Sequence, residues 1–140
     1  MEAPAWAVEM LATARVARLA TADAAGRPLA VPVCFALVEG RIYSAVDAKP
    51  KRTRELRRLR NIAENPHVSL VVDVWDEDWT KLAWVIVDGT AGILTTDMER
   101  APALAALVAK YPQYAVMDLA TTAGPVIAIT PTRVLAWRPR

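Results

Sequence analysis

Residues 41–62 read RIYSAVDAKPKRTRELRRLRNI, a short apolar run that passes directly into a strongly basic one. The first six residues have the alternation and the aromatic and β-branched content of a strand. In the basic part, Leu56, Leu59 and Ile62 recur every three residues, which predicts a helix with one narrow apolar stripe. The stretch therefore predicts a strand that leads into a charged helix.

The rest of the chain adds strand-like segments joined by hairpin-length connections, with few helices between them. Further helices are expected at residues 5–14 and 97–110, the second capped by Thr96 or Asp97. The expected strands are residues 16–21, 29–38, 41–46, 68–75, 82–94 and 126–137. Pro32 indicates an edge strand or a bulge, and Asp88 with Gly89 indicates a turn or a bulge. About six strands with two or three helices predict the α+β class, with an antiparallel barrel or sheet.

Length and charge limit the function. A chain of 140 residues is expected to form one domain, residues 1–140. Its net charge is +2, but seven of the 17 basic residues lie between Lys49 and Arg60, opposed only by Glu55. A basic patch on an otherwise mildly acidic protein indicates an anionic partner of limited size, rather than duplex nucleic acid.

The chain shows none of the usual signs of a membrane or secreted protein. No apolar run approaches the ~18 residues of a membrane helix, and residues 1–4 do not open a signal peptide. Cys34 is the one cysteine, so no internal disulfide can form, and within an apolar strand it is expected to be a buried, inert thiol. These features predict a cytoplasmic location.

Several kinds of catalytic site lack the residues they need. With His67 as the one histidine, serine or cysteine triads have almost no material to draw on and two-histidine metal motifs are excluded, and His67 is expected to be structural or exposed. No phosphate-binding glycine loop is present. The acidic residues 73–78 could hold a metal, but a solvated loop is the stronger interpretation, and no metal site is assigned. In an enzyme, a bound cofactor would therefore supply the chemistry.

The start of the basic segment has the groups of a phosphate site. A hydroxyl of Ser44 or Thr53 could meet the charges of Lys49, Lys51 and Arg52. The N–H groups at the start of the following helix favour an anion at the same place. The alternative is a solvated helix whose arginines serve only to keep the surface polar.

The chain also carries short motifs in a defined order, at residues 17–21, 26–28, 31–33, 42–44, 49–52 and 65–70. In order and spacing they resemble the pyridoxamine 5'-phosphate oxidase-like superfamily. Residues 49–62, 78–84 and 110–114 resemble more closely its branch of probable coenzyme F420-dependent proteins, and the resemblance covers nearly the whole chain.

The resemblance implies a split β-barrel homodimer that binds a flavin or deazaflavin at the subunit interface. It places the ring of the cofactor against Pro32 and Val33. For the phosphate it implies the residues around the end of the strand and the start of the helix: Ser44, Ala45, Lys49, Lys51, Arg52 and Thr53. The helix can be aligned with its shorter counterparts in the family in more than one way, and the other alignments make Arg57, Arg58 or Asn61 the phosphate contact.

Aromatic residues are a second candidate part of the site. Trp75, Trp79 and Trp84 surround the acidic loop and are expected either to line a pocket beside the ring, with Trp79 as the contact, or to pack in the dimer interface. Tyr43 lies next to Ser44, but no catalytic residue is assigned.

The charge of the helix bears on the choice of cofactor. FMN carries one phosphate, whereas coenzyme F420 carries a phosphodiester and a tail of several glutamates. Four arginines beyond the phosphate position favour F420. The expected function is an oxidoreductase that transfers hydride between F420 and a small organic substrate. The alternatives are an FMN-dependent oxidoreductase and a non-catalytic cofactor carrier, with a nucleic-acid binder or a haem-degrading enzyme less favoured.

Overall fold

The computed structural model of the chain describes residues 1–46 and 53–140, with side chains described as far as residue 46 and again from residue 57. The candidate residues Lys49, Lys51 and Arg52 lie outside the described residues.

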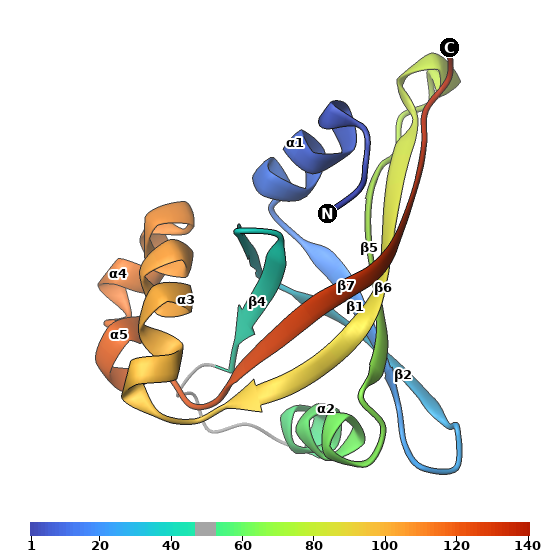
Figure 1. The fold of residues 1–140 in the computed structure, drawn as a ribbon. Coiled ribbons are helices and arrows are strands. Elements are labelled where there is room, and N and C mark those ends of the chain that lie inside the picture. Colours follow the sequence, from blue (N-terminus) through green and yellow to red (C-terminus); the bar gives the residue numbers. More distant parts are fainter. Residues whose placement is uncertain (47–52) are drawn as a thin grey trace.

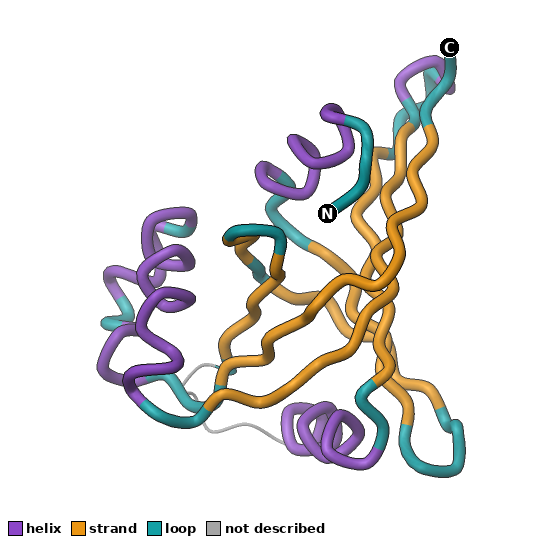
Figure 2. Tube along the Cα trace, in the orientation of Figure 1, coloured by secondary structure: helices purple, strands orange, loops and turns teal. Residues whose placement is uncertain are grey.

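A seven-stranded antiparallel sheet forms the centre of the molecule (Figures 1 and 2). The strands lie in the order β2-β1-β5-β6-β7-β4-β3. Their bounds are β1 Ala17–Ala22, β2 Pro28–Val33, β3 Ala36–Val38, β4 Arg41–Ala45, β5 His67–Val74, β6 Ala83–Leu94 and β7 Val126–Trp137. The class is α+β, as predicted.

The sheet curls into a half-barrel. Seven strands side by side in a flat sheet would place the two edge strands about 29 Å apart, because neighbouring strands are spaced by about 4.8 Å. The edge strands here are β2 and β3, and only Cys34 and Phe35 separate them in the chain. Three residue steps reach about 10 Å, so the two edges must meet at this point.

The inner face of the curled sheet holds the main core. Alternate residues of β1, β5 and β6 are buried, including Leu19, Leu70, Val72, Val85 and Val87. This alternation is the signature of a sheet with one face turned inward. Phe35 is fully buried and completes the core where the two edges meet.

Helices lie at the ends and on one side of the curled sheet (Figure 2). They are α1 Ala5–Thr13, α2 Thr53–Glu64, the 3₁₀ turn η1 Trp79–Lys81, α3 Asp97–Lys110, α4 Pro112–Val116 and α5 Leu119–Thr122. The apolar face of α1 packs Ala7 and Leu11 into the main core, and α3 packs Leu104 and Leu107 against β3 and β4. None of the described helices is long and apolar enough to cross a membrane.

The structure corrects the expected strand at residues 29–38. It is two strands, because the chain leaves β2 at Val33 and enters the opposite edge of the sheet at Ala36. Cys34 therefore lies in a break between strands and is partly exposed, not buried within a strand. The short helices α4 and α5 were also missed, since five and four residues are too few to show a helical period.

Local signals elsewhere are confirmed. Pro32 lies on an edge strand, and the register of β6 and β7 shifts between Asp88 and Gly89, where Thr132 of β7 is the extra residue of the bulge. The Thr96 hydroxyl accepts a hydrogen bond from the Glu99 N–H at 3.2 Å, which caps α3.

The end of α3 is fastened to the point where the two sheet edges meet. The Lys110 Nζ donates to the Phe35 carbonyl at 2.9 Å and lies 3.8 Å from the centre of the Phe35 ring. The Tyr111 hydroxyl accepts a hydrogen bond from the Phe35 N–H at 3.1 Å and lies within bonding distance of the Phe35 and Arg15 carbonyls. Burial, followed by the charge of Arg15, lowers the pKa of Lys110 from its usual 10.5 to about 8.

Lys110 should give the stability a pH dependence. Between about pH 8 and 10.5 the unfolded chain holds a proton on Lys110 that the folded protein has released, so a rise in pH stabilises the fold, and this gain is lost as the pH falls through 8. Because Lys110 is about half exposed, we expect only about 1 kcal/mol between pH 7 and 9.5. Urea unfolding of the wild type and of Lys110→Met at both pH values measures it. An equal change in both proteins would contradict it.

Candidate functional site

The end of β4 is the first part of the candidate phosphate site. Ser44 pairs with Ile127 and Ala45 with Val126 of β7, and both are buried. Since successive side chains in a strand point to opposite faces, Ser44 shares the face of Ile42, toward the main core, and Ala45 packs in the cluster under α3. The two neighbours therefore cannot present their side chains to the same ligand. The segment carrying Lys49, Lys51 and Arg52 follows directly.

The inner face of α2 holds the helix against the sheet. Arg58, Asn61 and Ile62 are 6%, 2% and 3% exposed. The Asn61 Nδ2 donates to the Thr21 Oγ1 of β1 at 3.1 Å. Arg58 and Asn61, both candidate phosphate contacts, thus face the protein interior.

An adjacent side of α2 carries two arginines. Arg57 and Arg60 line a pocket of about 300 Å³ between the helix and the turn that joins β1 to β2, where Arg27 also contributes. Arg60 is exposed, and the Arg57 Nη2 lies 3.4 Å from the Pro28 carbonyl. The structure therefore brings Arg57, a predicted phosphate contact, and Arg60, one of the four arginines beyond the phosphate position, together with an arginine from a different element.

Two carboxylates of the same pocket hold the turn. The Asp23 carboxylate accepts hydrogen bonds from the N–H groups of Ala25 and Arg27 and from the Arg27 side chain at 2.8 Å. These bonds, led by the Arg27 N–H, lower the pKa of Asp23. The Glu64 Oε1 accepts from the Ala24 N–H at 3.1 Å. Both carboxylates therefore have partners in the turn, and the pocket holds three arginines against two carboxylates, with Arg27 paired to Asp23.

The sequence analysis did not identify Arg27 as a site residue. It lies 30 residues before Arg57 in the chain, and the two meet only because Asn61 and Thr21 dock α2 on β1. The one local signal was the turn itself, where Asp23 and Gly26 precede Arg27.

The two expected ring contacts on β2 lie on opposite faces of the strand. Pro32 is exposed and pairs with Arg18 of β1, whereas Val33 is 6% exposed and packs in the main core. Only Pro32 presents its side chain to an outside molecule.

Trp79 lies far from these residues within one chain. It is 65% exposed on η1, in the loop between β5 and β6, and packs edge-to-face on Trp75 at 6.4 Å. The eight residues of β5 separate this loop from the end of α2, which at about 3.3 Å per residue is roughly 26 Å. The structure does not bring Trp79 to Ser44 in a single chain.

The acidic residues beside Trp79 organise their own loop. The Asp78 carboxylate accepts from the Thr80 N–H at 3.0 Å and caps η1, and the Asp76 carboxylate accepts from the Asp78 N–H at 2.7 Å. In residues 1–46 and 53–140, no group of three or more His, Cys, Asp or Glu side chains is placed to hold a metal ion.

Comparison with known proteins identifies the family of this fold. The family model described as pyridoxamine 5'-phosphate oxidase matches residues 4–138. The 5a,11a-dehydrotetracycline/5a,11a-dehydrooxytetracycline reductase of Streptomyces rimosus is 32% identical over 122 residues, which cover 86% of this chain and 72% of the reductase.

Solved structures share the fold at lower identity. The conserved hypothetical protein Rv2991 of Mycobacterium tuberculosis is 19% identical, with a TM-score of 0.76 over 99% of this chain and 86% of that one. A FAD-binding protein of Mesorhizobium loti is 22% identical, with a TM-score of 0.69 over 96% and 94% of the two chains. The curled sheet and the match over nearly all residues lead to one conclusion: the chain belongs to the pyridoxamine 5'-phosphate oxidase family.

Proposed function

We propose that this protein is an oxidoreductase that binds coenzyme F420 and transfers hydride between it and a small organic substrate. The similarity to a reductase and the family's fold support an oxidoreductase. One observation favours F420 over FMN: Arg57 and Arg60 line a pocket beside α2, after the segment proposed to hold a phosphate, and with Arg27 they outnumber the two carboxylates of that pocket, Asp23 and Glu64. A single phosphate does not need these additional charges, whereas a tail of carboxylates does.

The proposed cofactor contacts follow from position and chemistry. Lys49, Lys51 and Arg52 supply the charges for the phosphate, and the start of α2 at Thr53 supplies N–H groups. Exposed Pro32 offers a flat apolar surface to the ring. Since Arg58 and Asn61 face the sheet, Arg57 and Arg60 are the candidates on α2 for the tail. The described donors fit a long anion.

Bound F420 would supply the hydride chemistry. The contribution of the protein is to bind and orient the cofactor and to exclude water from the reacting face. No described side chain is assigned as a proton donor.

We also propose that two copies of the chain associate through the outer face of the sheet. Trp84 and Trp137 lie opposite each other in the β6–β7 register, and Leu135 and Trp137 are 41% and 44% exposed. An exposed apolar strip of this kind is typical of a protein interface. Association would carry the loop with Trp79 to the other copy. Sedimentation should give the mass of two 15.3 kDa chains, and a monomer at micromolar concentration would rule the dimer out.

The decisive experiment on the function is a parallel fluorescence titration with F420 and with FMN. Binding of F420 alone at low-micromolar concentration supports the proposal. Preferential binding of FMN would assign the chain to the flavin-dependent enzymes, and binding of neither would leave the proposed function without support. Oxidation of reduced F420 on addition of a dehydrotetracycline, the kind of substrate named for the Streptomyces relative, would separate an enzyme from a carrier.

A further inference from the structure

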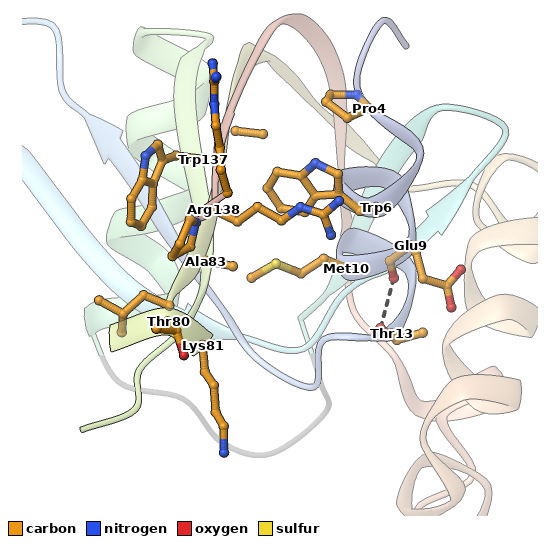
Figure 3. Close-up of a pocket in the computed structure, with 14 residues that line it drawn as sticks. Pro4, Trp6, Glu9, Met10, Thr13, Thr80, Lys81, Ala83, Trp137 and Arg138 are labelled. Atoms are coloured by element: carbon orange, nitrogen blue, oxygen red, sulfur yellow. Dashed lines mark hydrogen bonds between the residues drawn. The ribbon is translucent and has the colours of Figure 1, made fainter. Parts of the chain in front are cut away.

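A cavity of about 900 Å³ opens at the other end of the half-barrel, between α1 and the ends of β6 and β7 (Figure 3). Its inner wall is apolar. Trp6 and Met10 project from α1 toward the strands, and Ala83 and Ala136 lie on the inner face of the sheet. Deeper in the barrel, the corresponding inward positions of β5 and β6 carry the larger residues Val72 and Val85, which are fully buried. Because alanine is smaller than valine, Ala83 and Ala136 leave space beneath Trp6, whereas Val72 and Val85 fill the corresponding space deeper in the barrel.

The rim of this cavity is positively charged. Lys81 and Arg138 are exposed there together with Arg140, and among the described residues that line the cavity Glu9 is the one acidic side chain. Neither Lys81 nor Arg138 has an ion-pair partner within the described part of the chain. The rim thus attracts anions and repels cations.

Arg138 and Trp6 lie next to each other at the cavity, and both have flat polar or aromatic groups that can bind a flat ligand. The guanidinium carbon of Arg138 lies 4.8 Å from the centre of the Trp6 ring, so the two side chains are in cation–π contact and Arg138 covers part of one face of the indole (Figure 3). An indole surface favours a flat aromatic partner, and a guanidinium pairs with a carboxylate or sulfonate through two parallel hydrogen bonds.

We propose that this cavity binds a flat aromatic molecule that carries one negative charge. Its ring lies over Ala83 and Ala136 against Trp6 and Met10, and its anionic group pairs with Arg138. The volume matches the roughly 300–1,000 Å³ of small-molecule sites, and the mouth of a β-barrel is a common position for such sites. The cavity shares no lining residue with the cationic pocket beside α2.

A matched pair of fluorescent probes tests the proposal. 1-Anilinonaphthalene-8-sulfonate carries the aromatic rings and the charge, and N-phenyl-1-naphthylamine has the same rings without the sulfonate. We expect both to bind, with the sulfonate tighter. Arg138→Gln should weaken binding of the sulfonate by about tenfold, the loss of one charge-assisted contact, and leave the neutral probe unchanged. Arg41→Gln, an exposed arginine at the start of β4, is the control and should change neither.

A second variant tests the position of the rings. Ala136→Leu fills the space beneath Trp6 and should abolish binding of both probes, with circular dichroism to verify the fold. The proposal is overturned if Arg138→Gln leaves the affinity for the sulfonate unchanged, or if folded Ala136→Leu still binds both probes. Because Arg138 is exposed, the first result stands even where Ala136→Leu does not fold.

Discussion

Replacing Gly89 by alanine is expected to destabilise the protein by about 3 kcal/mol, near the upper end of the cost of forcing an extra group into a packed interior. A Cβ at this position would lie 2.5 Å from the Thr130 carbonyl oxygen and 3.1 Å from the Ile129 Cγ2. The first atom belongs to the backbone of β7, so it cannot move aside without separating the two strands. Gly89 also lies at the bulge where the register of β6 and β7 shifts. Urea unfolding measures the loss.

Gly92 provides the matched control on the same strand. A Cβ there would meet nothing within 4 Å, and Gly92 is exposed. Gly92→Ala should therefore change the free energy of unfolding by no more than about 1 kcal/mol, the scale of strand propensities. Equal free energies of unfolding for the two variants would contradict the prediction, because they would show that β7 accommodates a Cβ at residue 89 without loss of stability.

Lys51→Ala is expected to weaken binding of both F420 and FMN by about 10–100-fold, because a charge-assisted contact to a phosphate contributes ~1.5–3 kcal/mol. The prediction rests on the proposed phosphate role of the segment between β4 and α2. Fluorescence titration of each cofactor measures it, and Arg41→Ala is the control for a general loss of positive charge. An unchanged affinity for both cofactors would remove Lys51 from the site.

The double substitution Arg57→Gln with Arg60→Gln makes the same titration more specific. Both side chains line the pocket beside α2, beyond the proposed phosphate position. The double variant should lose affinity for F420 and keep its affinity for FMN, since only F420 has a tail of carboxylates. A parallel loss for both cofactors would instead place these arginines at the phosphate.

The parts of the fold that local chemistry controls could be predicted from the sequence. The Thr96 cap and the alternation of β5 each depend on a few neighbouring residues. The break at Cys34 and Phe35 could not be predicted in this way. It exists because the sheet curls until its two edges meet, which is a property of all seven strands together.

The candidate site shows the same division. The basic segment and the start of α2 are legible in the sequence. The sequence does not show which arginines of α2 face outward, because that depends on how the helix packs on the sheet. Asn61 bonds to Thr21, 40 residues away, and this contact turns Arg58 inward and Arg57 toward Arg27. Similarly, the distance of Trp79 from Ser44 follows from the length of β5 and not from any motif.

The place of β7 in the sheet has a consequence for biosynthesis. β7 lies between β6 and β4, so the β3–β4 hairpin joins the rest of the sheet only through this late strand. On the ribosome, residues 36–45 emerge early and can pair with each other as a hairpin, yet β4 has no second partner strand until residues 126–137 have left the exit tunnel. Until then the long strand β6 presents an open edge as well. A nascent chain that stalls before β7 would thus expose two unpaired edges, and it is this intermediate, not the finished protein, that chaperones would have to protect.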